Sequence, residues 1–277
     1  MAALFVGELL SYLRHVCGLE RLTDSSTTGF SSPLARAGVA VNHFSLGPRA
    51  LAPLSASVPL RIMPLGASIT YGQGSSDGNG YRGPLRDQLV GAGNIVNMVG
   101  SRPHGVMVDS EVEGWPGFRI EQVHEKAREA VPRYKPNVIL VNVGTNDAVQ
   151  NRNVSTAGER MEAMITDLFD MSPRAVVILS TLLVNKNPAN ERNVLAINQQ
   201  FGALVPRLYD QGRRIILVDM HAADSGPLLQ DLVDETHPGD IGYAKMAGTW
   251  LWGLSQVNNL GWLQRPEPIP GLPDNGA

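Results

Sequence analysis

Five short apolar runs alternate with helical segments from residue 60 onward, and this alternation constrains the fold more than any other feature. The runs are rich in Val, Ile and Leu, as in strands buried on both faces of a parallel sheet. The expected strands are Leu60–Leu65, Ile95–Val99, Val138–Val143, Val176–Leu183 and Ile215–Val218. Apolar residues at helical spacing indicate the helices Tyr81–Ala92, Phe118–Val131, Thr156–Met171, Glu191–Tyr209 and Ile241–Leu254. The pattern predicts an α/β fold, a three-layer α/β/α sandwich around a parallel sheet.

The flanking segments have a different composition. Residues 1–59 combine an amphipathic helix with an irregular arm rich in Ser, Pro and Ala, and residues 258–277 form a Pro- and Gly-rich tail that we expect to be loosely held. The α/β domain itself is expected over residues 60–257. Hydrophobic residues make up 43% of the 277 residues, enough for a full core.

Composition excludes several classes of function. The net charge is −3 and no long basic run is present, so a nucleic-acid partner is not expected. No apolar run reaches the length of a membrane span. Cys17 is the single cysteine and the histidines are scattered, so neither an intrachain disulfide nor a metal or other cofactor is expected. The first 20 residues make a poor secretory signal, which favours a cytoplasmic location over secretion. Nothing in the sequence indicates an oligomeric state.

Ser68 follows the first expected strand at a place suited to a nucleophile. The apolar run stops at Gly66, and Ser68 comes two residues later. A glycine allows a sharp turn there, and a following helix would point its free N–H groups at the serine. Ser68 is therefore a candidate nucleophile. An ordinary strand-to-loop turn with Ser68 as a helix cap gives the same local pattern.

A serine nucleophile needs a base and an orienting acid, and Asp234 and His237 can supply both. They lie three residues apart in a loop directly before the last expected helix. This spacing lets the carboxylate reach the imidazole Nδ1, so that Nε2 faces the serine. The alternative is a loop-capping histidine beside a solvated aspartate.

Two further strand ends carry candidate donors for an oxyanion hole. Gly100 ends the run NMVGS, and the absence of a Cβ allows its backbone N–H to approach an oxyanion. Asn146 lies in VNVGTND, where its amide can donate into a cleft. The backbone N–H of Ser68 would be the third donor. An Asx-type turn is the simpler interpretation for Thr145 and Asp147.

Together these motifs resemble the four sequence blocks of the SGNH hydrolases, also called the GDSL family. The blocks here are Gly66-Ala67-Ser68, Gly100, Gly144-Thr145-Asn146-Asp147 and Asp234-Glu235-Thr236-His237. With GYRGPLRDQL, EGWPGFRI and HPGDIGYAKMA, the segment 60–257 is most similar to the family-three carbohydrate esterases, which include acetyl xylan esterases. The resemblance implies a flavodoxin-like sheet of five parallel strands. It also implies a Ser68, His237 and Asp234 triad with Gly100 and Asn146 as oxyanion donors.

The resemblance predicts a serine esterase that hydrolyses short-chain, acetyl-type esters of small molecules or carbohydrates. Tyr81, Arg82 and Trp115 are candidate substrate contacts; packing of Trp115 against the next helix is the alternative. Ala67 departs from the family, which usually has Asp before the serine. This departure leaves open a catalytically weak or silent binding protein. The same residues would also serve an acyltransferase to a small-molecule acceptor.

Overall fold

The computed structural model describes residues 53, 54 and 58–274. The expected N-terminal helix and most of the arm in residues 1–59, together with Cys17, lie outside the described residues. Among the described residues, no helix is both long and apolar enough to span a membrane.

The central sheet contains the five expected strands, with small shifts at their ends. They are β1 (Leu60–Gly66), β2 (Val96–Met98), β5 (Val138–Asn142), β6 (Val176–Ser180) and β7 (Ile215–Val218). They run parallel in the spatial order β2-β1-β5-β6-β7. This is the doubly wound order of flavodoxin-like folds, in which ligands bind beyond the carboxyl ends of the strands. The predicted fold class is confirmed.

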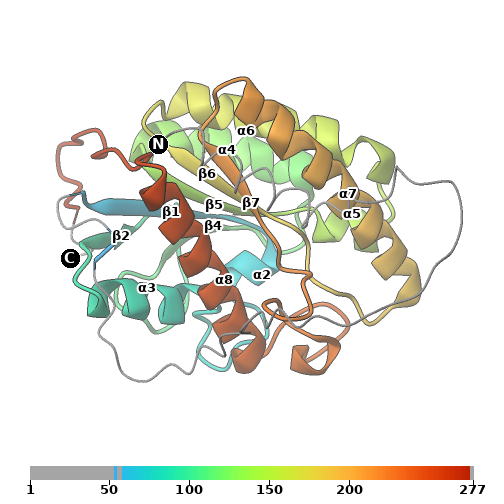
Figure 1. Cartoon of the computed structure of the whole chain (residues 1–277). Helices are drawn as coiled ribbons and strands as arrows, with labels where there is room; N and C mark the ends of the chain where they lie inside the picture. Colours follow the sequence, from blue (N-terminus) through green and yellow to red (C-terminus); the bar gives the residue numbers. More distant parts are fainter. Residues whose placement is uncertain (1–52, 55–57, 275–277) are drawn as a thin grey trace, which may run out of the picture. The chain divides into compact units, whose positions relative to one another are not determined.

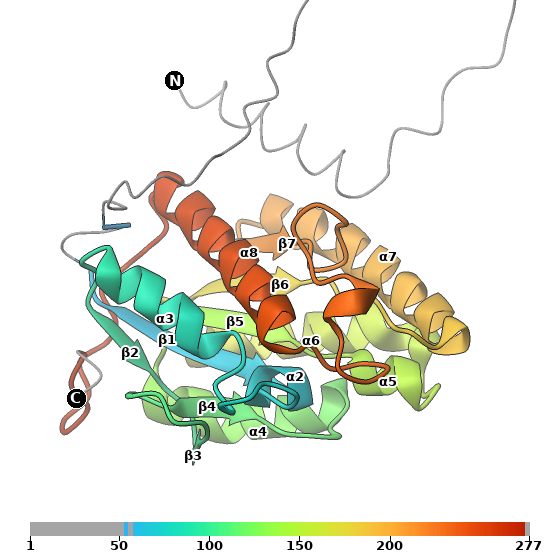
Figure 2. The same cartoon turned by 90° about the horizontal axis from the view of Figure 1, so that it is seen from below.

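Helices cover both faces of this sheet, as Figures 1 and 2 show. One face carries α3 (Arg82–Gly91) and α8 (Asp240–Asn259), and the other carries α4 (Ile120–Tyr134), α6 (Ala157–Met171) and α7 (Pro188–Asp210). Alternate strand residues enter the two cores: Ile62 packs toward α3 and α8, and Met63 packs toward the other layer. Each fully buried side chain of this kind contributes about 1.5–3 kcal/mol.

A short hairpin that was not predicted from the sequence extends the edge of the sheet beside β1. The hairpin pairs β3 (Arg102–Pro103) antiparallel with β4 (Glu111–Gly114), and β4 runs parallel to the end of β1. Because β5 occupies the other side of β1, β2 and β4 share one edge, β2 along its start and β4 along its end. This hairpin brings new residues to the carboxyl edge of the sheet.

Short helices follow two of the strands. They are α2 (Ser68–Tyr71), after β1, and α5 (Thr145–Val149), after β5; the 3₁₀ turns η1 (Val154–Thr156) and η2 (Leu229–Asp231) complete the described elements. Helices of one turn are not stable in isolation, so α2 and α5 depend on the contacts around them.

The described part of the tail, up to Asp274, is held more firmly than a loose tail would be. Buried Arg61 pairs with Asp274, with 2.6 Å between Nη2 and Oδ1, and donates to the carbonyl of Glu267 at 2.8 Å. Asn137 also donates to the carbonyl of Gln264 at 2.7 Å. The polar groups at the start of β1 and β5 therefore find their partners in the segment after α8.

Candidate active site

Ser68, His237 and Asp234 meet at the carboxyl edge of the sheet, although 169 residues separate the first two. Nε2 of His237 lies 2.9 Å from Oγ of Ser68, and Nδ1 of His237 lies 2.7 Å from Oδ2 of Asp234. The structure thus brings together the three residues expected from the sequence. The arrangement suits a hydroxyl that gives its proton to an imidazole held by a carboxylate.

The loop before α8 fixes the carboxylate and the imidazole relative to each other. Oδ1 of Asp234 accepts the backbone N–H groups of Thr236 and His237, each at 2.7 Å. Partial burial alone would raise the pKa of the Asp234 carboxyl, but these bonds and the contact with the His237 ring lower it. Asp234 therefore stays charged at neutral pH and holds the ring through Nδ1.

The turn that presents Ser68 requires very close backbone packing. A Cβ at Gly66 would lie 2.2 Å from the carbonyl oxygen of Asn142 on β5, so only glycine fits there. Ala67 then takes the N-cap position of α2, and Ser68 becomes the first helical residue. The N–H of a first helical residue has no acceptor within its helix, so that of Ser68 is available to a ligand.

Lys186 and Asn185, in the loop after β6, support the loop that carries Asp234 and His237. Nζ of Lys186 donates to the carbonyl of Leu232 at 2.8 Å, and its backbone N–H donates to the carbonyl of Glu235 at 3.0 Å. Nδ2 of Asn185 reaches Oγ1 of Thr236 at 3.1 Å. These residues were not predicted, because nothing in a single sequence connects positions so far apart.

Gly100 lies against β4, and this contact by itself requires a glycine. A Cβ at Gly100 would lie 2.4 Å from the carbonyl oxygen of Val112. The close approach that requires glycine is therefore to the neighbouring strand. It places the Gly100 backbone beside the strand that pairs with the end of β1.

Glu113 is a buried acid next to Gly100 that was not predicted as part of the site. Its side chain accepts the backbone N–H of Ser101 at 2.8 Å, the Ser101 hydroxyl at 3.1 Å and the indole N–H of Trp115 at 2.6 Å. Only 1% of Glu113 is exposed, so these donors, and not water, satisfy its carboxyl oxygens. The only sign of Glu113 in the sequence is a glutamate within a short extended segment. A glutamate that is buried at such a place needs hydrogen-bond donors around it, as Glu113 has here.

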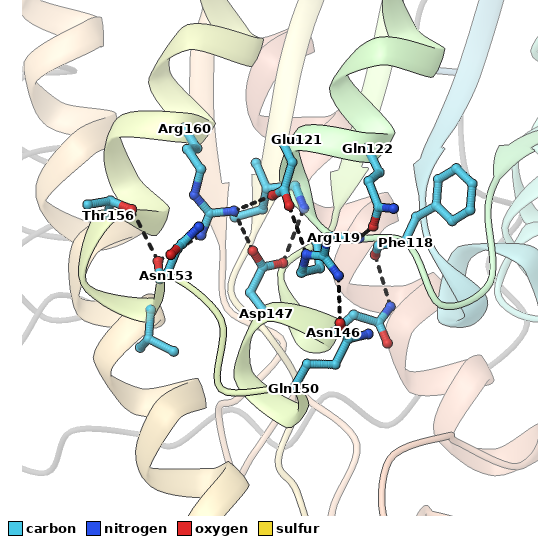
Figure 3. Close-up of polar contacts among 12 residues, drawn as sticks. Phe118, Arg119, Glu121, Gln122, Asn146, Asp147, Gln150, Asn153, Thr156 and Arg160 are labelled. Carbon is cyan, nitrogen blue, oxygen red and sulfur yellow. Dashed lines mark hydrogen bonds and ion pairs between the residues drawn. The ribbon is translucent and has the colours of Figure 1, made fainter.

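Asn146 sits in the first turn of α5, which begins after Gly144 at a φ of +126°. Nδ2 of Asn146 donates to the carbonyl of Phe118 at 2.9 Å, as Figure 3 shows. A carbonyl can only accept, so the amide nitrogen must face Phe118, and one of its two N–H groups remains for another acceptor. Asp147 points away from Asn146 and accepts the N–H of Ile120 at 3.1 Å instead of closing a local turn.

Tyr81 and Arg82 do not line an open surface, which corrects their expected role as substrate contacts. Both are completely buried. Burial raises the pKa of Tyr81 to about 12, and its ring packs 5.7 Å from that of Trp250. The Arg82 guanidinium binds four backbone carbonyls, those of Tyr71, Gly78, His104 and Ser110, at 2.9–3.1 Å. Arg82 thus ties together the loops beside Ser68.

Trp115 is half-buried, and its ring is engaged by protein groups. It stacks with Phe118 at 5.5 Å between ring centroids, and Arg102 and Lys126 lie 4.6 and 4.9 Å from its centroid. With its N–H bound to Glu113, the indole is held from several sides. Packing against the next helix, the alternative considered above, fits these contacts better than stacking on a sugar.

Known proteins resemble this chain in sequence and in fold. Residues 65–245 match the GDSL-like lipase/acylhydrolase family. The chain therefore belongs to this family, whose members are acylhydrolases.

One sequence relative and two of the similar solved structures are described as esterases. A multidomain esterase from Ruminococcus flavefaciens is 28% identical over 242 residues, covering 77% of this chain and 31% of that protein. The chain therefore spans about a third of the length of that relative. Among solved structures, a family 3 carbohydrate esterase from Clostridium thermocellum matches with a TM-score of 0.64, 23% identity and coverage of 73% of this chain and 98% of the other. An acetyl esterase mutant with an acetate ion matches with a TM-score of 0.63, 21% identity and coverage of 73% and 99%. The structural matches show a shared fold.

Proposed function

We propose that the chain is a serine esterase that hydrolyses short-chain, acetyl-type esters, including esters on carbohydrates. The observation that carries the proposal is the continuous chain of hydrogen bonds from Ser68 through His237 to Asp234. The family and the esterases among its relatives support the same reaction class.

In the proposed reaction, the Ser68 oxygen attacks the ester carbonyl while His237 Nε2 takes the hydroxyl proton. The N–H groups of Ser68, Gly100 and Asn146 bind the oxyanion that forms. The tetrahedral intermediate expels the alcohol, which receives the proton from His237, and leaves an acyl-Ser68 enzyme. Water then attacks the acyl group with His237 again as base, releasing the carboxylic acid and restoring the serine.

A fixed rim around the nucleophile favours small acyl groups. Arg82 holds four carbonyls of the surrounding loops, and the side chain of Asn79 accepts the N–H groups of Val106 and Met107 at 2.8 and 3.0 Å. Loops tied in this way do not provide the mobile apolar lid that a long lipid chain would need. The names of the acetyl esterase and carbohydrate esterase neighbours agree with this preference.

Hydrolysis of p-nitrophenyl acetate, butyrate and octanoate by the full chain and by Ser68→Ala tests the proposal. We expect kcat/KM to fall with acyl length, and Ser68→Ala to lose activity by a factor of about a thousand or more. Full turnover by Ser68→Ala would refute the assignment of the nucleophile. A preference for octanoate would refute the short-acyl specificity while leaving the esterase reaction intact.

A further inference from the structure

A cluster of charged and polar side chains joins α4, α5 and α6 directly behind Asn146 (Figure 3). At its centre lies Asp147, whose side chain is completely buried. Its carboxylate accepts the backbone N–H of Ile120, at the start of α4, and a charge-assisted bond from Arg160 on α6. Burial raises the pKa of the Asp147 carboxyl, and the bond to Arg160 opposes that change.

Arg160 extends the cluster to both sides of α5. Besides Asp147, it binds the Glu121 carboxylate at 2.7 Å and the carbonyl of Asn153 at 2.8 Å. Glu121 in turn binds Arg119 at 2.8 Å, and Arg119 reaches Gln150 at the end of α5 at 2.7 Å. The five residues of α5 are thus tied to the neighbouring helices at both ends.

Asn146 and Asp147 both form hydrogen bonds to the backbone at the start of α4. The Asn146 amide binds the carbonyl of Phe118, and the Asp147 carboxylate binds the N–H of Ile120, two residues further on. The first contact orients the amide and the second fixes the distance between α5 and the start of α4. Since a helix of one turn has little stability of its own, these external bonds determine where the Asn146 amide points.

We infer that Asp147 is a positioning residue that sets the Asn146 amide for binding the oxyanion. This inference rests on the proposed esterase reaction. A displacement of about 1 Å at a catalytic group can lower a rate a hundredfold, so a bond one residue away can act on the reaction. A purely architectural role for Asp147 predicts a loss of stability with no effect that depends on Asn146.

The test is a double-mutant cycle with Asp147→Asn and Asn146→Ala. Asparagine keeps the shape of Asp147 and can still accept the Ile120 N–H, but it loses the charge that pairs with Arg160. The first readout is kcat and KM for p-nitrophenyl acetate. The second is the rate at which a fluorophosphonate labels Ser68, followed by mass spectrometry. In that reaction the Oγ–P bond forms, the P–F bond breaks, the hydroxyl proton passes to His237 and fluoride leaves. The phosphonyl oxygen takes the place of the oxyanion, so no natural substrate is needed.

Asp109→Asn is the matched control. The Asp109 side chain is 2% exposed, and its Oδ2 also accepts one arginine bond, from Arg86, and one backbone N–H, from Met98. It makes no hydrogen bond to Asn146 or its neighbours. We expect both aspartate variants to melt at a lower temperature, and the control to keep its kcat within about twofold.

We expect Asp147→Asn to lower both kcat and the labelling rate about tenfold with little change in KM, and to have less than about a twofold effect in the Asn146→Ala background. The same fold-loss in both backgrounds, or an unchanged rate in the single variant, would overturn the inference. If Asn146→Ala itself leaves both rates unchanged, the proposed oxyanion hole is wrong and the inference falls with it. An unlabelled, inactive full chain would refute the proposed reaction. Should Asp147→Asn fail to fold, Arg160→Lys tests the same point, because it keeps the charge but lacks the planar guanidinium fork through which Arg160 binds Asp147, Glu121 and Asn153.

Discussion

Replacing Asn146 by alanine separates two contributions of one side chain. The amide makes a hydrogen bond of 2.9 Å to the carbonyl of Phe118, and under the proposed reaction it donates a second one to the oxyanion. The first bond exists in the resting protein. The second forms only as charge develops on the substrate, so its loss should appear in kcat and not in KM.

The two contributions have different magnitudes. Loss of one oxyanion donor costs about 2.7–4 kcal/mol in the transition state, so we expect kcat to fall by about a hundredfold to a thousandfold. Loss of the bond to Phe118 costs about 1 kcal/mol of the free energy of unfolding, because Asn146 is only half-buried. In a domain of this size, that lowers Tm by about 2–4 °C.

Asn193→Ala provides a matched control, because it removes another hydrogen bond to the same short helix, α5. Nδ2 of Asn193, on α7, donates to the carbonyl of Ala148 at 2.9 Å, and Asn193 is also half-buried. We expect a similar fall in Tm with kcat unchanged. The assay is steady-state hydrolysis of p-nitrophenyl acetate together with thermal unfolding of all three proteins. If Asn146→Ala lowers Tm as the control does but leaves kcat intact, or raises KM alone, Asn146 is not an oxyanion donor.

Three other predictions address the acid limb of the pH profile, the residue before the nucleophile and the tail. Activity on a chemistry-limited substrate should be lost on acidification once Asp234 is protonated, because only its charged form holds the His237 ring for proton transfer; the lowered pKa of the Asp234 carboxyl places this loss below the pH at which an ordinary aspartate is protonated, and activity that persists unchanged below the pKa of Asp234 would exclude it as the orienting acid. Ala67→Asp should raise Tm by about 2–4 °C or raise kcat, because Ala67 occupies the N-cap of α2 without a side-chain cap bond; a lower Tm and a lower kcat would mean that desolvation of the carboxylate at this 5% exposed position dominates. Asp274→Asn should lower Tm by several degrees without changing kcat, because it removes the ion-pair partner of buried Arg61; an unchanged Tm would show that the backbone acceptors around Arg61 suffice.

The buried parallel strands could be predicted because their signal is local. Val138–Asn142, for example, is buried at every position and reads as an almost unbroken apolar run. The strand Glu111–Gly114 could not be predicted in the same way, because it contains one apolar residue between two glutamates. It forms a strand because β1 and β3 pair with it and because Glu113 finds three donors nearby.

The proposed nucleophile, base and acid could also be located from the sequence, because each follows a strand end or precedes a helix at the edge where such residues gather. The surrounding residues could not. The charge and hydrogen-bond donors of Arg82 suit a substrate-binding residue. In the structure, however, its four acceptors are backbone carbonyls from segments spread over residues 71–110. Whether an arginine faces a ligand or a set of carbonyls depends on tertiary contacts that the sequence pattern does not show.

Position 67 carries alanine where the family usually has an aspartate, but buried carboxylates lie on both sides of Ser68. On the Gly100 side, buried Glu113 holds the N–H of Ser101. On the Asn146 side, buried Asp147 holds the start of α4. Each proposed oxyanion donor outside α2 therefore has a buried carboxylate bound to the backbone beside it, and neither carboxylate depends on position 67. A chain built in this way can keep the proposed oxyanion donors in place with alanine before Ser68, which favours an active enzyme over a silent one.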